Sequence, residues 1–210
     1  MRAFVLLVAL CAGACVTHRE APSRYDLDAS APHADAGPRL NATIAVAPIQ
    51  APSWLSTTAL IYRLDYETPA NRSAYARSEW AAPPSELLTQ RLRERLSAAN
   101  DGFTLDRLPK ATDGYQLRVT LENFIQTLQS PHESRCLVTL NATLVRRGDQ
   151  VIGQRTFRTS SVAPSADARG AVAGLIDATD SNFAEIVTWL RMTLTAQPAS
   201  TPGAQATPDR

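Results

Sequence analysis

The chain has 210 residues, which is long enough for one domain of ordinary size with short appendages. Its 21 lysines and arginines nearly balance its 20 aspartates and glutamates, so the molecule as a whole has no field that attracts nucleic acid or an anionic membrane surface. We therefore expect one compact core and no nucleic-acid partner.

Residues 1–14 have the layout of a bacterial secretory signal, with Arg2 ahead of a short apolar run and then small residues. The run is shorter than the roughly 20 apolar residues that a transmembrane helix needs. Three small residues stand directly before Cys15, as the lipoprotein-processing peptidase requires, whereas Leu10 stands before Cys11. We predict cleavage that leaves Cys15 as a lipidated N-terminus. Cleavage without lipid is the alternative.

Lipidation of Cys15 would fix the mature protein to a membrane, with diacylglycerol on the sulfur and an acyl chain such as palmitate on the amine. The domain would then lie in the periplasm. Val16 follows the cysteine in place of the aspartate that retains lipoproteins at the inner membrane, so we expect an outer-membrane location. Cys136 would be the only thiol left, which excludes an intramolecular disulfide, and its alternating apolar surroundings predict a buried strand cysteine.

Residues 15–38 are rich in Ala, Pro, His and Asp without strand or helix periodicity, and we expect them to form the lipidated N-terminus and a flexible tether. Tyr25 and Leu27 within this stretch are a candidate docking point on the domain. The domain itself is expected over residues 39–195, followed by a low-complexity, disordered tail over residues 196–210.

The first half of the domain contains three predicted strands and a helix. Alternation around Ile44 and Val46 indicates a half-buried strand, and two short strands are predicted at residues 59–66 and 73–81. Two prolines then open an amphipathic helix that ends at an Asn-Asp-Gly sequence. The apolar stripe of this helix consists of Leu88, Leu92 and Leu96, flanked by Arg91, Arg93, Glu94 and Arg95.

The second half contains four predicted strands and a longer helix. A short strand is predicted at residues 103–108, and three strands with a period of two follow, around residues 115–122, 136–145 and 150–161. The helix is predicted from about Asp167 to Thr195. This order predicts an α+β fold, in which two helices pack on one face of a mainly antiparallel sheet.

No catalytic, metal or cofactor site is expected. His18, His33 and His132 lie in tether or loop sequence, without a second ligand at metal-binding spacing. The chain has no glycine-rich phosphate loop, no nucleophile elbow and no local Ser/His signature. We therefore expect a protein that is not an enzyme and holds no cofactor.

Aromatic and arginine residues in irregular sequence form a candidate partner-binding set. Trp54 and Leu55 lie in a loop after Pro52, Tyr62 and Arg63 lie in the sequence LIYRLD, and Trp80 precedes the first helix. Trp, Tyr and Arg are enriched at interface hot spots because each combines a large side chain with a polar group. Packing in the core is the alternative for Tyr62 and Trp80.

A series of short motifs spans nearly the whole predicted mature chain. They are Tyr25 and Leu27, the strand at Ile44, Trp54-Leu55, Tyr62-Arg63, Tyr75, Trp80-Ala81, Pro83-Pro84 and the final helix with Trp189-Leu190. In this order the motifs resemble the ABC-type transport auxiliary lipoproteins, the family that includes paraquat-inducible protein C.

The resemblance implies a non-enzymatic outer-membrane lipoprotein that works with an ABC permease, its ATPase and a mammalian-cell-entry-domain protein that bridges the periplasm. The implied cargo is phospholipid or another lipid, and the implied role is to dock the bridging protein to the outer membrane. The resemblance also implies a sandwich fold similar to the N-terminal domain of the Tol-system periplasmic protein, and self-association into a homo-oligomer is a further expectation.

Two other functions stay open at the level of the sequence. One is a lipoprotein of lipopolysaccharide or outer-membrane protein assembly, which would have the same lipid anchor and a similar fold. The other is a periplasmic hydrolase with an unrecognised site. An enclosed pocket with convergent polar groups would favour the hydrolase, and neighbouring genes for a permease, an ATPase and a mammalian-cell-entry protein would favour the transport role.

Overall fold

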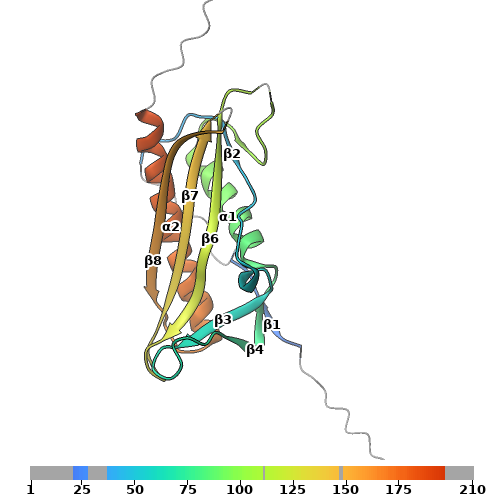
Figure 1. The fold of residues 1–210 in the computed structure, drawn as a ribbon, viewed down its shortest axis with the longest axis vertical. Coiled ribbons are helices and arrows are strands. Elements are labelled where there is room, and N and C mark those ends of the chain that lie inside the picture. Colours follow the sequence, from blue (N-terminus) through green and yellow to red (C-terminus); the bar gives the residue numbers. More distant parts are fainter. Residues whose placement is uncertain (1–20, 28–36, 111, 147–148, 197–210) are drawn as a thin grey trace, which may run out of the picture.

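The computed structural model describes residues 21–27, 37–110, 112–146 and 149–196. The predicted signal, the lipidation site at Cys15 and the tail after residue 196 lie outside these residues. The described chain forms one eight-stranded sheet with two helices packed against the same face (Figure 1). The predicted α+β class, with both helices on one side of the sheet, is therefore confirmed.

Three long strands make up the regular part of the sheet. They are β6 (Tyr115–Leu128), β7 (Ser134–Arg146) and β8 (Gln150–Val162), which pair with antiparallel register along their lengths. Apolar side chains alternate along β6 and β7, and those on the helix side are buried. The period-two prediction found these strands, although β6 continues six residues beyond the predicted segment.

The other side of β6 pairs with two short strands that follow one another along it. These strands are β2 (Ile44–Val46) and β3 (Ala59–Leu64), both parallel to β6. β4 (Ser73–Trp80) pairs antiparallel with β3, and β5 (Thr104–Leu105) pairs parallel with β2. The sheet is thus mixed, and the expected antiparallel pairing holds for its long strands and for the β3–β4 hairpin.

An additional strand, β1 (Ser23–Tyr25), lies inside the stretch that was predicted to be a tether. It pairs parallel with β4, opposite residues 78–80. Leu27, just after it, is only 1% exposed, and Tyr25 packs against the edge of the core. The predicted docking point at Tyr25 and Leu27 is therefore confirmed, and residues 21–27 belong to the domain.

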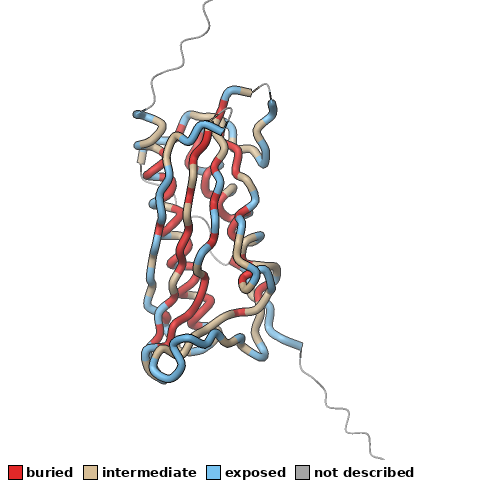
Figure 2. Tube along the Cα trace, viewed as in Figure 1, coloured by how far each residue is buried: buried red, intermediate tan, exposed pale blue. Residues whose placement is uncertain are grey.

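The two helices, α1 (Pro84–Ala99) and α2 (Ala168–Thr195), supply the second layer. The predicted leucine stripe of α1 is fully buried. α2 packs mainly on β7 and β8, and Gly174 permits a close approach because a Cβ there would lie 2.7 Å from the sulfur of Cys136. Figure 2 shows buried residues along the central strands of the sheet and along both helices. Cys136 is buried in this layer, as predicted, and burial raises the pKa of its thiol to about 12.

Candidate partner-binding surface

The described residues show neither a metal centre nor a membrane-spanning helix. No group of three His, Cys, Asp or Glu side chains among them is placed to hold a metal ion. His132 is the one histidine within the described ranges, and it lies exposed in the β6–β7 turn. In the same part of the chain, neither helix combines the length and apolar character that a membrane crossing needs.

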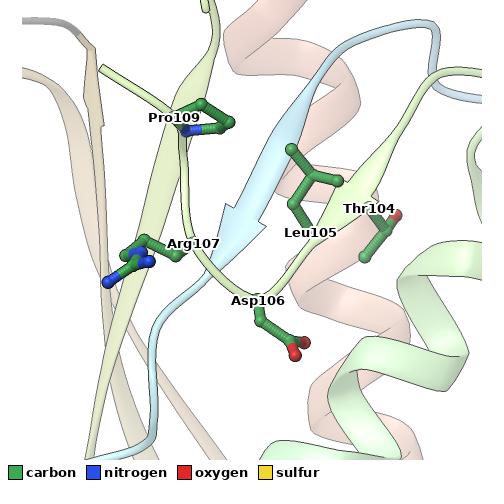
Figure 3. Close-up of a pocket in the computed structure, with 5 residues that line it drawn as sticks. All are labelled: Thr104, Leu105, Asp106, Arg107 and Pro109. Atoms are coloured by element: carbon green, nitrogen blue, oxygen red, sulfur yellow. The ribbon is translucent and has the colours of Figure 1, made fainter.

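One open hollow, of about 550 Å³, lies beside β5 and is lined by Thr104, Leu105, Asp106, Arg107 and Pro109 (Figure 3). All of these residues come from β5 and the loop after it. The carboxylate of Asp106 forms an ion pair of 3.2 Å with Arg93 of α1, and Arg107 points to the opposite side of the loop. The hollow therefore lacks the enclosed, convergent polar groups that a hydrolase would need.

Trp54 lies in a short helical turn, η1 (Ser53–Leu55), between β2 and β3. Its ring packs against the edge of the core and is partly exposed. The guanidinium of Arg72, which precedes β4, lies 4.4 Å from the centre of the ring in a cation–π contact. This contact joins two segments that are remote in sequence and leaves an aromatic and a cationic group at one place on the surface.

Tyr62 and Tyr75 meet across the β3–β4 hairpin, with ring centres 4.6 Å apart. The Tyr75 hydroxyl donates a hydrogen bond of 2.6 Å to the side-chain oxygen of Gln126, which is fully buried. Burial raises the pKa of Tyr75 well above its usual value, with a smaller contribution from the charge of Asp167. The hydroxyl is therefore a permanent hydrogen-bond donor, and this pair holds the hairpin against β6.

The remaining residues of the predicted set divide into one surface residue and two core residues. Arg63 is partly exposed and donates to Asp65 at 2.5 Å. Leu55 and Trp80, in contrast, are each 1% exposed, and the Trp80 ring packs 5.4 Å from that of Phe124. These two side chains have no surface to offer a partner, so the surface set is corrected to Trp54, Tyr62 and Arg63.

The sequence did not reveal the role of Arg91, which was expected at the flank of the α1 stripe. Its side chain is 4% exposed and makes a two-point ion pair with Asp180 of α2, with distances of 3.0 and 2.9 Å. It also donates a bond of 2.5 Å to the backbone carbonyl of Leu27. Arg91 thus joins both helices to the segment that follows β1. No local sequence pattern indicates this role, because Asp180 lies 89 residues away in the chain.

Comparison of the sequence with models of known protein families identifies the family of the chain. The family model described as ABC-type transport auxiliary lipoprotein component matches residues 25–187, from β1 into α2. The chain belongs to this family. The predicted family is confirmed, and with it the assignment of the protein as an auxiliary lipoprotein component of ABC-type transport.

Solved structures of similar fold support the architecture. A Xanthomonas campestris protein of the DUF330 family is similar over 83% of this chain and 95% of its own length, with 20% identity and a TM-score of 0.65. An uncharacterized protein is similar over 81% of this chain and 99% of its own, with 16% identity and a TM-score of 0.62. Among curated proteins no sequence matches the chain. At identities of 20% and 16%, these structures show that the fold is shared and carry no information about function.

Proposed function

We propose that this auxiliary lipoprotein is anchored in the outer membrane through Cys15 and docks a periplasm-spanning, mammalian-cell-entry-domain protein of a lipid-transporting ABC system. The family match over residues 25–187 is the observation that carries the proposal. In this role the protein acts through binding and not through catalysis.

The way in which the N-terminal segment joins the domain supports anchoring at that end. Ser23 begins β1 and comes eight residues after Cys15 in the sequence. A chain of eight residues reaches at most about 28 Å. Because Arg91 fixes the carbonyl of Leu27 to both helices, a pull on the lipidated N-terminus is transmitted to the whole domain. The anchor therefore holds the β1 side of the sheet near the membrane.

Tyr62 and Arg63 lie in β3, which is separated from β1 only by β4, and Trp54 lies in η1, shortly before β3 in the chain. Replacing Trp54 by Ala should weaken capture of the partner while leaving the domain folded, because the ring is only partly buried. A large loss of thermal stability would instead show that Trp54 contributes mainly to the core.

Affinity purification of the tagged protein from detergent-solubilised membranes tests the docking role. We expect the mammalian-cell-entry protein, together with its permease and ATPase, to be recovered with the wild-type protein. Recovery of lipopolysaccharide-assembly or outer-membrane-protein-assembly components in their place would overturn the proposal.

Replacing Cys15 by Ala tests the anchor. We expect the variant to move from the membrane to the soluble periplasmic fraction. Cys136→Ala is the matched control and should stay on the membrane, because its thiol is buried and takes no part in anchoring. A Cys15→Ala protein that stays on the membrane would contradict a lipid anchor at this residue.

A further inference from the structure

β8 forms one edge of the sheet, and no strand among the described residues pairs with its outer side. In Figure 1 it is the outermost of the three long strands, with α2 behind the sheet. Its 13 residues are mostly exposed. An unpaired edge of this length presents a row of backbone donors and acceptors to which another extended segment can bind.

The hydrogen bonds of β8 show which backbone groups face outward. The N–H of Ala163, directly after β8, donates to the carbonyl of Ser134 in β7 at 3.0 Å. The register between the two strands is regular from Gly153 to Val162. Because hydrogen-bonding direction alternates along an antiparallel strand, the odd-numbered residues bond to β7 and the even-numbered residues face the free edge. The outward backbone groups are those of Gln154, Thr156, Arg158 and Ser160, but the carbonyl of Ser160 already accepts a hydrogen bond of 3.4 Å from the Arg135 side chain.

The charge along this edge is of one sign. β7 and β8 together contain four arginines and no acidic residue. Arg146 is paired with Asp113 at 3.1 Å, whereas Arg135, Arg155 and Arg158 form no ion pair within the described part of the chain. Arg135 lies at the edge itself, since it donates to the hydroxyl of Ser160 at 3.0 Å.

Apolar side chains lie exposed at both ends of the same strand. Val151 is 60% exposed and Val162 is 66% exposed, and they are two of the five large hydrophobic side chains that are exposed in the described residues. Strand edges that must stay unpaired are commonly shielded by a short strand, a proline, a bulge, charged side chains or a covering loop, and of these β8 carries only the charges of Arg155 and Arg158 over residues 153–162. Between Gly153 and Val162 the strand has neither a proline nor a register shift.

We propose that an extended, acidic segment of a partner protein adds to the sheet beside β8. Its backbone would bond to the outward groups of Gln154, Thr156 and Arg158, and its carboxylates would pair with Arg155 and Arg158. Arg155 lies over the Phe157 ring at 5.2 Å, and neither it nor Arg158 has a carboxylate partner among the described residues. Their charges favour an acidic segment over a second copy of this chain, because two copies of β8 would bring only like charges together. The inference deepens the proposed docking function, on which it rests for the identity of the partner.

Site-specific photo-crosslinking in intact cells tests this site. A photoreactive phenylalanine analogue replaces Gln154 at the free edge, or Thr188 on the exposed side of α2 as a matched control. We expect irradiation to join position 154, and not position 188, to a partner peptide with more acidic than basic residues. No adduct at position 154, an adduct with a second copy of this chain, or an adduct with a basic peptide would overturn the inference.

A proline at position 156 sharpens the test. Thr156→Pro removes an outward N–H while leaving the backbone bonds to β7 intact, as prolines on edge strands do. It also removes the hydrogen bond that the Thr156 hydroxyl accepts from Asn141 at 3.0 Å, and Thr156→Val removes the same bond. The yield of the adduct should fall about tenfold, the effect expected of losing one backbone bond and adding a steric clash. Thr156→Val keeps the N–H and should leave the yield unchanged. Unchanged yield in a folded Thr156→Pro protein would contradict strand addition.

The identity of the captured protein separates this inference from the proposed function. An adduct with the mammalian-cell-entry protein supports both. An acidic segment from an unrelated protein supports the β8 site and overturns the proposed docking partner. Co-purification of the mammalian-cell-entry protein without an adduct at position 154 leaves the docking role standing and overturns the β8 site.

Discussion

Of the strands that end the sheet, β1, β5 and β8, the first and the last are constructed in opposite ways. At one edge, β1 covers the end of β4, Leu27 is buried beside it, and Arg91 ties this segment to both helices. At the other edge, β8 has no partner strand among the described residues, and Arg155 and Arg158 have no carboxylate there. The sheet next to the predicted lipid anchor thus ends in a three-residue strand tied to the core, whereas β8 offers thirteen residues to the external partner that we propose.

Among the variants that compare the two edges, Arg91→Ala should cause the largest loss of unfolding free energy. The change leaves the Asp180 carboxylate without this partner in a largely buried place, and breaking a buried pair in this way costs about 3 to 5 kcal/mol of unfolding free energy. Urea unfolding measures the loss. Arg24→Ala, which removes the exposed pair with Glu79, is the control and should cost less than about 1 kcal/mol. Equal losses in the two variants would show that Arg91 does not hold the covered edge.

Truncation of Leu27 should have the next largest effect. Its side chain is 1% exposed, and a buried Leu→Ala change typically costs about 2 to 5 kcal/mol through lost contacts and a residual cavity. Val162→Ala at the free edge is the matched control, because that side chain is 66% exposed and its loss should change stability by less than about 0.5 kcal/mol. Thermal unfolding of both variants compares the edges directly, and a neutral Leu27→Ala would mean that the β1 segment adds little to the domain.

Local sequence patterns predicted the elements better than they predicted the pairings. The leucines of α1 and the alternation in β6 and β7 have short periods, so the helices and long strands could be found from neighbouring residues. The parallel pairing of β2 and β3 with β6 depends on contacts between segments about 64 to 71 residues apart, for which a local pattern holds no information. β1 was missed as a strand for the same reason, although Tyr25 and Leu27 marked its position.

The candidate site was predictable only in part. Trp54 and Trp80 are both tryptophans in irregular sequence, yet one is partly exposed and the other is buried against Phe124. Residue type indicates the capacity to bind a partner, but exposure depends on which element packs over the side chain. Arg91 shows the converse case, since a charged residue beside a leucine stripe is usually solvated and here becomes buried through Asp180 of α2.

Asp167, the N-cap of the helix that covers β7 and β8, is expected to make a moderate contribution to stability that depends on pH. Its carboxylate accepts hydrogen bonds from the Gly170 N–H at 2.8 Å and the Ser165 hydroxyl at 2.7 Å, which hold its pKa below the usual value. Asp167→Ala should cost about 1 kcal/mol at neutral pH. Because the folded-state pKa is lowered, this contribution is present above the ordinary pKa of about 3.9 and is lost as the pH falls through the folded-state value.

Chemical denaturation of the wild type and Asp167→Ala between pH 7 and pH 3 checks this pattern. Asp167→Asn keeps the shape and a hydrogen-bond acceptor without the charge, so its loss of stability at neutral pH should be smaller than that of Asp167→Ala. Because neither variant titrates at this position, the difference in unfolding free energy between the two variants should not change with pH over this range. If the difference in unfolding free energy between the wild type and Asp167→Ala stays constant down to pH 3, the charge of Asp167 does not contribute to stability.

The smallest effect on stability is expected at the free edge. Arg158 is exposed and has no ion pair within the described residues, so Arg158→Ala should change the unfolding free energy by less than about 0.5 kcal/mol. The same change should reduce crosslinking at position 154, because it removes a charge that the acidic segment would meet. A strongly destabilised Arg158→Ala protein would indicate that this edge, like the first, is part of the packed structure.

Amide hydrogen exchange in the purified domain tests the contrast between the two edges most directly. We predict rapid exchange at Gln154, Thr156, Arg158 and Ser160, and slow exchange at the intervening residues that bond to β7. At the covered edge, the N–H of Ala81, which donates to the Tyr25 carbonyl at 2.7 Å, should be protected. Protection of the four outward amides in the isolated protein, or rapid exchange at Ala81, would contradict the account of one closed and one open edge.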